Sequence, residues 1–359
     1  MDPDRDAPLH LFQRFPDLRR ALPRFPLVRR PTPVRHLETL GSHLGHDDLW
    51  LKDDSGGPPV GGNKARKLEF LVADALRKRR RTLVTIGYLG TNHGLATALA
   101  AREAGITARV VLIDEVASDH VRDTLLRLNA IGARMHHAPG EVLSVPVAAG
   151  ALARAGLSRT APYWVAPGGS SPLGTVGYVE AGLELAAQVR AGELPEPGEV
   201  YVPLGSAGTS AGIGLGLALG GLNTRVRAVR VVSPRMATTA RTLALCRKVW
   251  RLLQRSGGAP GPMPAVALDA VAGFEGPGYG TDTPEALAAM AMGEELADLS
   301  LEVTYTARTL AALVAAARGG RLEGPALLWN TFHPRGPLPA GAPEWHALPP
   351  AFHAPFAGE

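Results

Sequence analysis

The sequence predicts an α/β protein of two domains built around parallel β-sheets. From about residue 64 onward, short β-branched segments alternate with Ala- and Leu-rich segments of helical period, which is the pattern of a parallel sheet with crossover helices. The length of 359 residues suits roughly two domains of about 150 residues each. Apolar residues make up 45% and charged residues 20% of the chain, a balance that favours a folded core over disorder.

The expected elements follow one another in regular alternation. A helix, a strand, a second helix and a second strand are expected at residues 64–78, 82–86, 92–103 and 109–113. Gly105 stops the second helix, and a third helix begins after Ser118 and ends at Gly132. Further strands are expected near residues 133–137, 163–165, 200–203 and 226–232, and further helices at residues 174–191 and from about Thr209. The Pro- and Ala-rich residues after Pro334 are expected to be loop.

The composition predicts a cytoplasmic protein that spans no membrane. Cys246 is the single cysteine, so neither an internal disulfide nor a zinc site of several thiolates is possible, and a reducing compartment fits. The first six residues contain three Asp and begin no apolar run, so no signal peptide is expected. The uncharged stretch at residues 200–223 contains Pro203 and a Gly/Ser/Thr cluster, and it is far less apolar than a membrane span.

The basic charge and two pairs of histidines suggest binding of nucleic acid or of a metal ion, and the rest of the sequence supports neither. The pI near 9.6 and the basic run at residues 77–81 invite a nucleic-acid interpretation. That run ends a predicted helix, where cations complement the helix dipole, and no aromatic residues interleave it. Two pairs of histidines lack a third ligand at a defined spacing, namely His43 with His46 and His136 with His137. No nucleic-acid partner and no metal are therefore predicted.

The first stretch that carries chemistry is at residues 61–70 (GGNKARKLEF), where two glycines and a good N-cap residue precede a helix. Lys64 falls in the first turn of that helix. Because its ammonium opposes the positive end of the helix dipole, we expect the pKa of Lys64 to be lowered. Such a lysine is a candidate amine nucleophile for a Schiff base with a carbonyl cofactor, usually pyridoxal phosphate. A surface lysine beside a cap is the alternative.

The second stretch is a small-residue loop at residues 205–212 (GSAGTSAG), between an expected strand and an expected helix. Backbone N–H groups, hydroxyls and the helix dipole would converge there on an anion, so a phosphate-binding loop is predicted. The spacing is neither the G-x-G-x-x-G of a dinucleotide site nor the Gly-Lys-Ser/Thr ending of a P-loop. A Gly-rich turn that allows close helix packing is the alternative.

The third stretch is at residues 90–93 (GTNH), where the strand at residues 82–86 passes into the next helix. The carboxyl ends of parallel strands are where such folds bind ligands, so these polar side chains are candidate site residues. In the alternative interpretation Thr91 is only an N-cap and His93 is only a hydrogen-bonded helix residue.

Together these stretches resemble the pyridoxal-phosphate enzymes of the tryptophan-synthase-β type (fold type II), specifically the 1-aminocyclopropane-1-carboxylate deaminase and D-cysteine desulfhydrase family. The resemblance covers nearly the whole chain, through ordered motifs at residues 31–33, 61–70, 91–93, 168–170, 173–174, 177–180, 205–212, 276–280 and 305–306. It implies a small domain at residues 67–174 and a large domain at residues 1–66 and 175–359, with the cofactor in the cleft between them. It also implies pyridoxal 5'-phosphate as cofactor, a small amino acid as substrate and a homodimer.

The resemblance also implies roles for individual residues. Lys64 matches the Schiff-base lysine, and Asn92 matches the asparagine that hydrogen-bonds the ring oxygen of the cofactor. Tyr279 and Tyr305 match two active-site tyrosines near the substrate, one of which assists proton transfer. Thr331 occupies the place of the threonine that bonds the pyridine nitrogen. The phosphate-binding loop of the family corresponds to Gly205, Ser206, Ala207, Gly208, Thr209 and Ser210.

The chain departs from the family pattern at two places. Thr91 stands where the family usually has serine, and its extra methyl group narrows the site and alters how a substrate carboxylate or nucleophile is placed. The His-Thr-Gly-Gly signature reads Asn-Thr-Phe-His at residues 330–333, so the bulky Phe332 and His333 replace two glycines that let the backbone approach the ring. These departures bear on the substrate more than on the cofactor.

The resemblance implies an α,β-eliminating lyase or deaminase of the D-cysteine desulfhydrase kind, with Lys64, Thr91, Tyr279 and Tyr305 in catalysis. In the ring-opening deaminases a glutamate after the tyrosine keeps the pyridine nitrogen protonated, whereas Thr306 stands there in this chain. A neutral hydroxyl does not raise the nitrogen pKa as a carboxylate does, so elimination of a good leaving group is expected to exceed ring opening. The alternatives are a 1-aminocyclopropane-1-carboxylate deaminase and a catalytically idle carrier of pyridoxal phosphate, the latter because Phe332 and His333 would crowd the ring.

Overall fold

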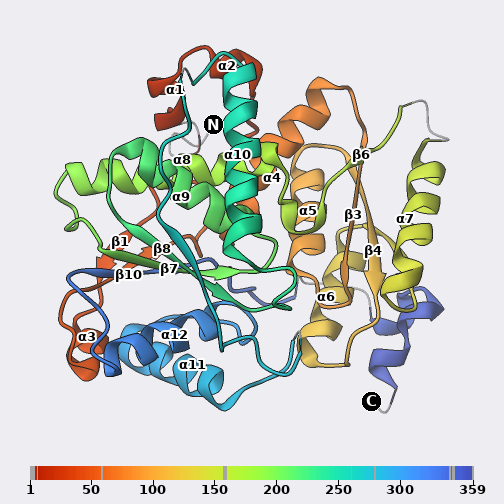
Figure 1. Ribbon diagram of the computed structural model, residues 1–359. Helices are drawn as coiled ribbons and strands as arrows, with labels where there is room; N and C mark the ends of the chain where they lie inside the picture. Colours follow the sequence, from red (N-terminus) through yellow and green to blue (C-terminus); the bar gives the residue numbers. More distant parts are fainter. Residues whose placement is uncertain are drawn as a thin grey trace. The chain divides into compact units, whose positions relative to one another are not determined.

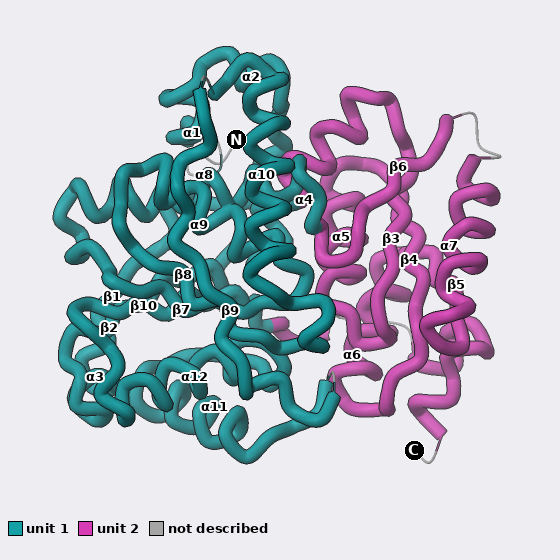
Figure 2. The backbone as a smooth tube through the Cα atoms, in the orientation of Figure 1, with its two compact units in different colours: residues 1–67, 170–334 teal, residues 68–169, 335–359 magenta. Residues whose placement is uncertain are grey.

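The computed structural model describes residues 5, 7–57, 60–156, 160–259, 261–278, 280–338, 341 and 344–357. The chain divides into two compact units (Figure 2). Unit 1 comprises residues 1–67 and 170–334, and unit 2 comprises residues 68–169 and 335–359. Each unit is built on a largely parallel β-sheet with helices, which confirms the predicted α/β class.

The sheet of unit 1 has six strands in the order β1-β2-β10-β7-β8-β9. All neighbouring strands pair parallel except β1 with β2. The last strand of the chain, β10, lies between β2 and β7 and is buried along its whole length, because helices cover both faces of the sheet. The strands are β1 (Val34–His36), β2 (Leu49–Asp53), β7 (Glu199–Leu204), β8 (Arg225–Arg230), β9 (Leu268–Val271) and β10 (Ala326–Asn330).

Two groups of helices enclose this sheet (Figure 1). One face carries α8 (Pro172–Arg190), α9 (Gly208–Gly220) and α10 (Thr239–Arg255), and the other carries α3 (Glu38–Leu44), α11 (Pro284–Ala297) and α12 (Thr306–Arg318). Glycines let α8 and α9 approach closely, since a Cβ on Gly182 would lie 2.7 Å from the carbonyl oxygen of Ile213. This close packing holds α9 against α8. The short helices α1 (His10–Arg14) and α2 (Leu18–Ala21) complete the unit.

The sheet of unit 2 has four parallel strands in the order β5-β4-β3-β6. The strands are β3 (Thr82–Tyr88), β4 (Thr107–Ile113), β5 (Arg134–Ala138) and β6 (Tyr163–Trp164). The helices that pack with them are α5 (Asn92–Glu103), α6 (Asp119–Ala130) and α7 (Glu141–Gly156), and η1 (Pro167–Gly169) is a short 3-10 turn. Helix α4 (Gly62–Arg77) begins with residues of unit 1 and ends with residues of unit 2.

The C-terminal segment, residues 335–359, belongs to unit 2, whereas the family resemblance implied that it is part of the large domain. It forms the 3-10 turns η2 (Trp345–Ala347), η3 (Pro350–Phe352) and η4 (Ala354–Phe356) where loop was expected. Phe352 and Phe356 are buried, and the Phe352 ring packs edge-on against the His137 ring with 5.8 Å between their centroids. Arg122 of α6 donates to the carbonyl oxygen of Pro355 over 2.8 Å. Aromatic burial therefore orders a segment that its Pro and Ala content made look irregular.

The expected helices and strands between residues 64 and 232 are present, with ends shifted by a few residues. The structure also contains elements that were not predicted, chiefly β1, β2, β10, α7 and α10 to α12. In the part of the chain that the structure describes, no helix combines the length and apolar character needed to cross a membrane. The expectation that the cofactor lies between the two domains stays a prediction.

Candidate active site

The first turn of α4 is tied to the end of β10. Gly62 has a φ of +65°, and a Cβ there would lie 2.7 Å from the carbonyl oxygen of Thr331. The N–H of Asn63 donates to the same oxygen over 3.0 Å, and the N–H of Gly62 donates to Asp54 O over 2.9 Å. Gly62 is therefore needed for the close approach of the chain to Thr331, and backbone hydrogen bonds to Asp54 and Thr331 fix the turn that carries Lys64.

Lys64 has an unusual electrostatic environment for a lysine. Burial lowers its pKa from 10.5 to about 8, and the negative charge of Glu302 opposes part of this shift. The predicted direction is confirmed, but removal of water from the amine is the main cause rather than the helix dipole. Lys64 Nζ donates to Asn63 Oδ1 over 2.6 Å and lies 5.9 Å from the centroid of the Tyr305 ring.

Tyr305 is held in place by Glu302, which is not among the predicted site residues. The Glu302 carboxylate accepts the N–H groups of Thr304, Tyr305 and Thr306 over 3.0, 2.7 and 2.9 Å, which fixes the start of α12. Burial raises the pKa of Glu302. Glu302 is the single charged residue in the segment 299–307, and that isolation is the signal by which the sequence could have indicated it.

The predicted phosphate-binding loop, residues 205–210, connects β7 to α9. It groups hydrogen-bond donors in an arrangement that we call the phosphate cup. Ala207 has a φ of +67°, which turns the chain so that α9 begins at Gly208. The N–H of Gly208 donates to Ser170 Oγ over 3.2 Å, and the hydroxyls of Ser170 and Ser206 lie 2.8 Å apart. A side chain at Gly208 would collide with Ser170 and would lie 3.0 Å from Lys67 Nζ.

Lys67 and Ser170 are two further residues of this cup that are not among the predicted ones. Lys67 is 2% exposed, and its Nζ donates to Ser170 Oγ over 3.0 Å. Burial and the charge of Lys64 hold the pKa of Lys67 well below that of an ordinary lysine. Since residues three apart lie on the same face of a helix, the spacing from Lys64 to Lys67 could have indicated this second amine.

The other members of the loop have more local contacts. Thr209 Oγ1 accepts a hydrogen bond from Asn63 Nδ2 over 3.4 Å, which links the loop to the turn of Lys64. The hydroxyl of Ser210 donates to Pro203 O over 3.4 Å and is fully buried, so Ser210 offers its backbone rather than its side chain. A helix N-terminus, the hydroxyl groups of Ser170 and Ser206 and a buried amine are donors that suit a phosphate dianion, and the residues present therefore fit a phosphorylated cofactor.

Residues 330–333 carry Phe332 and His333 where the family signature has two glycines. Thr331 directly follows β10 and is 6% exposed. The His333 ring packs on Gly61, where a Cβ would lie 2.6 Å from His333 Cγ, and His333 Nδ1 lies 2.6 Å from Ser55 O. The N–H of Phe332 donates to Asn330 Oδ1 over 3.1 Å. The histidine that replaces a glycine is thus held against the loop before Lys64 by its own hydrogen bond.

Thr91 and Asn92 lie at the start of α5 in unit 2. Thr91 is the N-cap, and its Oγ1 accepts the N–H of Gly94 over 3.0 Å. Gly87 and Gly94 leave room for its hydroxyl and methyl groups, because a Cβ on either glycine would collide with Thr91. His93 is 6% exposed and its Nε2 lies 2.9 Å from Thr85 Oγ1, which is the arrangement of a hydrogen-bonded helix residue.

Within unit 1 the structure brings together Lys64, Tyr305, Thr331 and the loop at residues 205–210, through the contacts above. Within unit 2 it brings Asn92 into contact with Arg335, which is not among the predicted residues. Tyr279 lies outside the residues that the structure describes.

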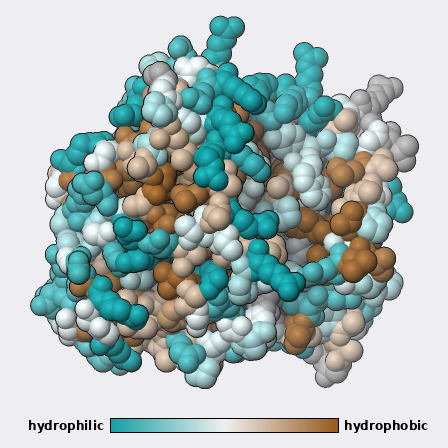
Figure 3. Space-filling view, in the orientation of Figure 1, coloured by the Kyte–Doolittle hydropathy of each residue, from teal (hydrophilic) through white to brown (hydrophobic). Residues whose placement is uncertain are grey.

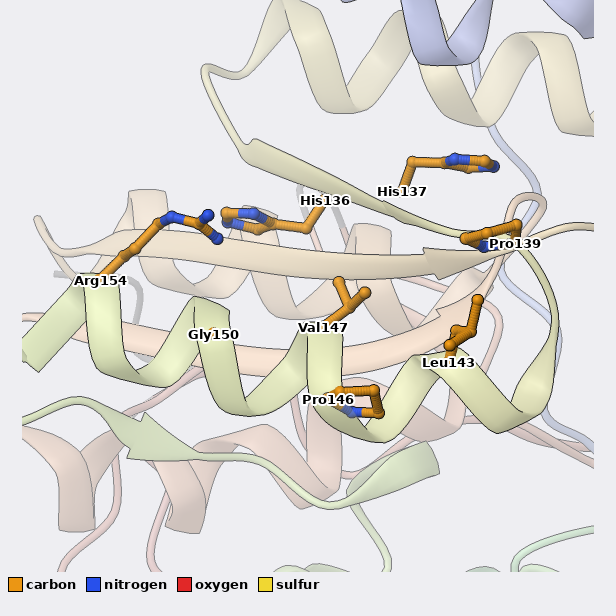
Figure 4. A pocket seen from close by; sticks show the side chains of 8 residues that line it. All are labelled: His136, His137, Pro139, Leu143, Pro146, Val147, Gly150 and Arg154. Atoms are coloured by element: carbon orange, nitrogen blue, oxygen red, sulfur yellow. The ribbon is translucent and has the colours of Figure 1, made fainter.

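A groove of about 500 Å³ lies between β5 and α7 of unit 2, and none of the predicted site residues lines it (Figure 4). Its lining includes Leu143, Val147 and the imidazoles of His136 and His137. Exposed apolar side chains on α7 give this side of unit 2 the brown surface at the right of Figure 3. Among the residues that the structure describes, no three His, Cys, Asp or Glu side chains are grouped to hold a metal ion.

Comparison with known proteins identifies the family. Residues 26–330 match the family model described as pyridoxal-phosphate dependent enzyme. The chain belongs to this family. The resemblance seen in the sequence is therefore confirmed, and pyridoxal phosphate is the cofactor of this enzyme.

The pyridoxal-phosphate enzyme is similar over most of its length to two curated relatives. It is 32% identical over 320 residues to a D-cysteine desulfhydrase of Klebsiella pneumoniae strain 342, a match that covers 86% of this chain and 93% of that protein. It is 32% identical over 332 residues to a D-cysteine desulfhydrase of Salmonella paratyphi B, with 90% and 96% covered. The expected class, a pyridoxal-phosphate-dependent lyase or deaminase, is confirmed by these matches.

The fold of the pyridoxal-phosphate enzyme is also found among solved structures. A crystal structure of an ACC deaminase homologue superimposes with a TM-score of 0.75 at 27% identity, and the match covers 92% of this chain and 95% of that one. This similarity confirms the predicted fold type II architecture.

Proposed function

We propose that this enzyme removes the β-substituent of a small amino acid of the D-cysteine type. The Cα–H and Cβ–S bonds break, sulfide leaves, and water converts the remaining fragment into a keto acid and ammonia. Two D-cysteine desulfhydrases at 32% identity support this proposal. The observation that carries it is the neutral hydroxyl at Thr306, directly after Tyr305, where ring-opening deaminases have a carboxylate.

Bound pyridoxal phosphate supplies an electron sink that makes the Cα proton of the substrate acidic. We assign to Lys64 the covalent attachment of the cofactor and the transfer of that proton. A pKa of about 8 leaves a larger fraction of its amine neutral at physiological pH than an exposed lysine has. The Tyr305 ring beside Lys64 Nζ limits the positions that this amine can take.

The loop at residues 205–210 binds the phosphate group in this proposal. Its donors are the N–H groups at the start of α9, the hydroxyls of Ser206 and Ser170, and the ammonium of Lys67. A phosphate dianion beside Lys67 supplies the opposite charge that raises the lysine pKa again, so binding and protonation of Lys67 favour each other.

The pyridine nitrogen meets neutral partners in this proposal, Thr331 and Thr306. The Thr306 hydroxyl accepts the N–H of Glu302 over 2.9 Å, and the Glu302 carboxylate is occupied by three N–H groups of the α12 start. A weak electron sink suffices when a thiolate leaves from Cβ, whereas an unactivated cyclopropane requires a strong one.

In unit 2 we assign substrate binding to Thr91 and binding of the ring oxygen of the cofactor to Asn92. The Thr91 oxygen accepts the N–H of Gly94, and the hydroxyl hydrogen is left to donate to a substrate carboxylate. Tyr305 and Tyr279 are assigned to proton transfer near the leaving group, on the resemblance to the family.

The proposal is tested by measuring release of sulfide, ammonia and keto acid from D-cysteine, from its β-chloro analogue and from 1-aminocyclopropane-1-carboxylate. The purified protein is first checked for the visible absorbance of lysine-bound cofactor. Turnover of D-cysteine and its β-chloro analogue is expected to exceed that of the cyclopropane. Faster turnover of the cyclopropane contradicts the proposal, and absence of all turnover supports the idle carrier.

We further propose that the enzyme is a cytoplasmic homodimer. The single cysteine, Cys246, is buried and suits a reducing compartment, and the homodimer is the assembly that the family resemblance implies. Light scattering coupled to size exclusion measures the mass directly, and a mass of one chain would contradict the dimer.

A further inference from the structure

We propose that Arg335 is a positioning residue that sets the orientation of the Asn92 side-chain amide. The inference rests on the proposed function in one respect, the assignment of Asn92 to the ring oxygen of the cofactor. It adds a residue from the C-terminal segment that no motif of the sequence indicates.

The contact fixes which end of the amide faces the arginine. Arg335 Nη2 donates to Asn92 Oδ1 over 2.5 Å. A guanidinium only donates hydrogen bonds, so the amide oxygen must face Arg335 and the NH2 group must face away from it. An asparagine without such a partner exchanges the two ends by rotation about its last side-chain bond. Arg335 therefore keeps the NH2 group of Asn92 presented as a donor.

Arg335 is itself held rigidly by α6. Its Nη1 donates to Asp123 Oδ2 over 2.9 Å and to Thr124 Oγ1 over 2.7 Å, and its side chain is 11% exposed. Burial alone would raise the pKa of Asp123, but hydrogen bonds from Arg127 and Arg335 hold it below its ordinary value. The carboxylate is therefore charged at neutral pH, and the guanidinium plane is fixed by two partners before it meets Asn92.

The Arg335 contact differs from the other ties of the C-terminal segment. Arg127 donates to the carbonyl oxygens of Gly336 and Pro337, and Arg122 donates to that of Pro355. Those arginines bind backbone and serve to anchor the segment on α6. Arg335 alone of these three reaches a side chain at the start of α5, and this is the contact that carries the proposal.

If the amide rotates, its oxygen replaces its NH2 group next to the ring oxygen of the cofactor. Two acceptors then face each other and one hydrogen bond is lost. Loss of a single hydrogen bond of this kind changes an affinity by about 2- to 12-fold. The absorbance of the lysine-bound cofactor also responds, because that hydrogen bond stabilises charge on the ring oxygen.

The test is a double-mutant cycle on the full-length protein with pyridoxal phosphate as the probe. The dissociation constant and the pH titration of the visible band are measured for the native chain, Asn92→Ala, Arg335→Met and the double variant. Arg335→Met alone is expected to weaken binding about 2- to 12-fold and to shift the band. In the Asn92→Ala background the same change is expected to have no further effect, since Arg335 acts through Asn92.

Arg122→Met is the matched control, because it removes an anchor of the same segment that does not touch Asn92. It is expected to leave the dissociation constant and the band unchanged. Arg335→Lys serves if Arg335→Met does not fold, as judged by thermal unfolding. One ammonium cannot bind Asp123, Thr124 and Asn92 in the same geometry, so the same band shift is expected.

The outcomes separate this inference from the proposed function. The positioning role is overturned if Arg335→Met weakens binding of pyridoxal phosphate equally in the native chain and in Asn92→Ala. It is also overturned if Arg335→Met does not change that binding in the native chain. If Asn92→Ala binds the cofactor as the native chain does, the assignment of Asn92 fails and the role of Arg335 fails with it. If the native chain shows no lysine-bound cofactor, the proposed function itself is overturned.

Discussion

The ε-amine of Lys67 donates to the hydroxyl of Ser170 over 3.0 Å, and that hydroxyl also accepts the N–H of Gly208. A buried lysine is thus placed at the first residue of α9, where backbone donors already favour an anion. The lysine three residues earlier, Lys64, lies beside Tyr305. One helical turn therefore presents two amines with different surroundings, one beside an aromatic ring and one beside the loop that precedes α9.

Lys67→Met is expected to weaken binding of pyridoxal phosphate about 10-fold or more, because it removes a charged donor from the phosphate cup. Titration of the apo protein with the cofactor measures this. Lys248→Met, an exposed lysine on α10, is the control and should bind as the native chain does. An unchanged dissociation constant for Lys67→Met would remove Lys67 from the site.

Lys64→Ala is expected to abolish the absorbance of covalently bound cofactor, since it removes the amine to which the covalent attachment is assigned. Borohydride reduction followed by peptide mapping identifies the modified lysine in the native chain. Lys78→Ala, at an exposed position just after α4, should retain the band. A phosphopyridoxyl group mapped to a different lysine would show that the assignment is wrong.

Gly208→Val is expected to reduce cofactor retention, because the new side chain would collide with Ser170 and crowd Lys67 Nζ. Gly56→Val is a matched control, since no atom lies within 4 Å of the position that its Cβ would take. Retention after gel filtration is compared for both variants. Equal retention by Gly208→Val and the native chain would count against the phosphate cup.

The pKa of Lys64 is expected to show in the pH dependence of acylation of the apo protein. Only the neutral amine reacts, so a pKa of about 8 moves the midpoint of the labelling rate well below that of an ordinary lysine at 10.5. Glu302→Gln should move it lower still, because the negative charge that opposes the shift is removed. Mass spectrometry of the Lys64 peptide follows the rate, and a native midpoint near 10.5 would refute the prediction.

Arg66→Met is expected to lower the free energy of unfolding by about 3–5 kcal/mol. Arg66 is fully buried and pairs with Asp54 and Glu184 at 2.8 and 2.9 Å, so its loss leaves two buried carboxylates without their main partner. Arg77→Met on the same helix removes a half-exposed guanidinium from Asp74, which keeps Lys78 and Tyr163 as partners, and should change stability by about 1 kcal/mol or less. Urea unfolding compares the two, and equal effects would contradict the expected role of burial.

The sequence predicted the parts of the site that depend on local pattern. Lys64 and the loop at residues 205–210 are indicated by glycines and cap residues, whose conformational needs are local, and the structure has the expected turns there. The role of Glu302 is also local, since it accepts the N–H groups of residues 304–306, but no glycine or cap pattern indicates it. Ser170 and Arg335 could not be found in this way, because their roles come from contacts between segments far apart in the chain. The same is true of β10, a strand of five residues that is defined by its neighbours in the sheet.

The position of β10 has a consequence for biosynthesis. It fills the place between β2 and β7, although nearly all of the chain precedes it. Until residues 326–330 leave the ribosome, β2 and β7 of the nascent chain therefore each have an edge that lacks its partner strand. Unpaired edges of this kind recruit other chains, so premature termination before residue 326 should yield aggregates rather than a smaller folded protein. The turn that carries Lys64 is likewise completed only after residue 331 has been synthesised, since the N–H of Asn63 donates to the carbonyl oxygen of Thr331.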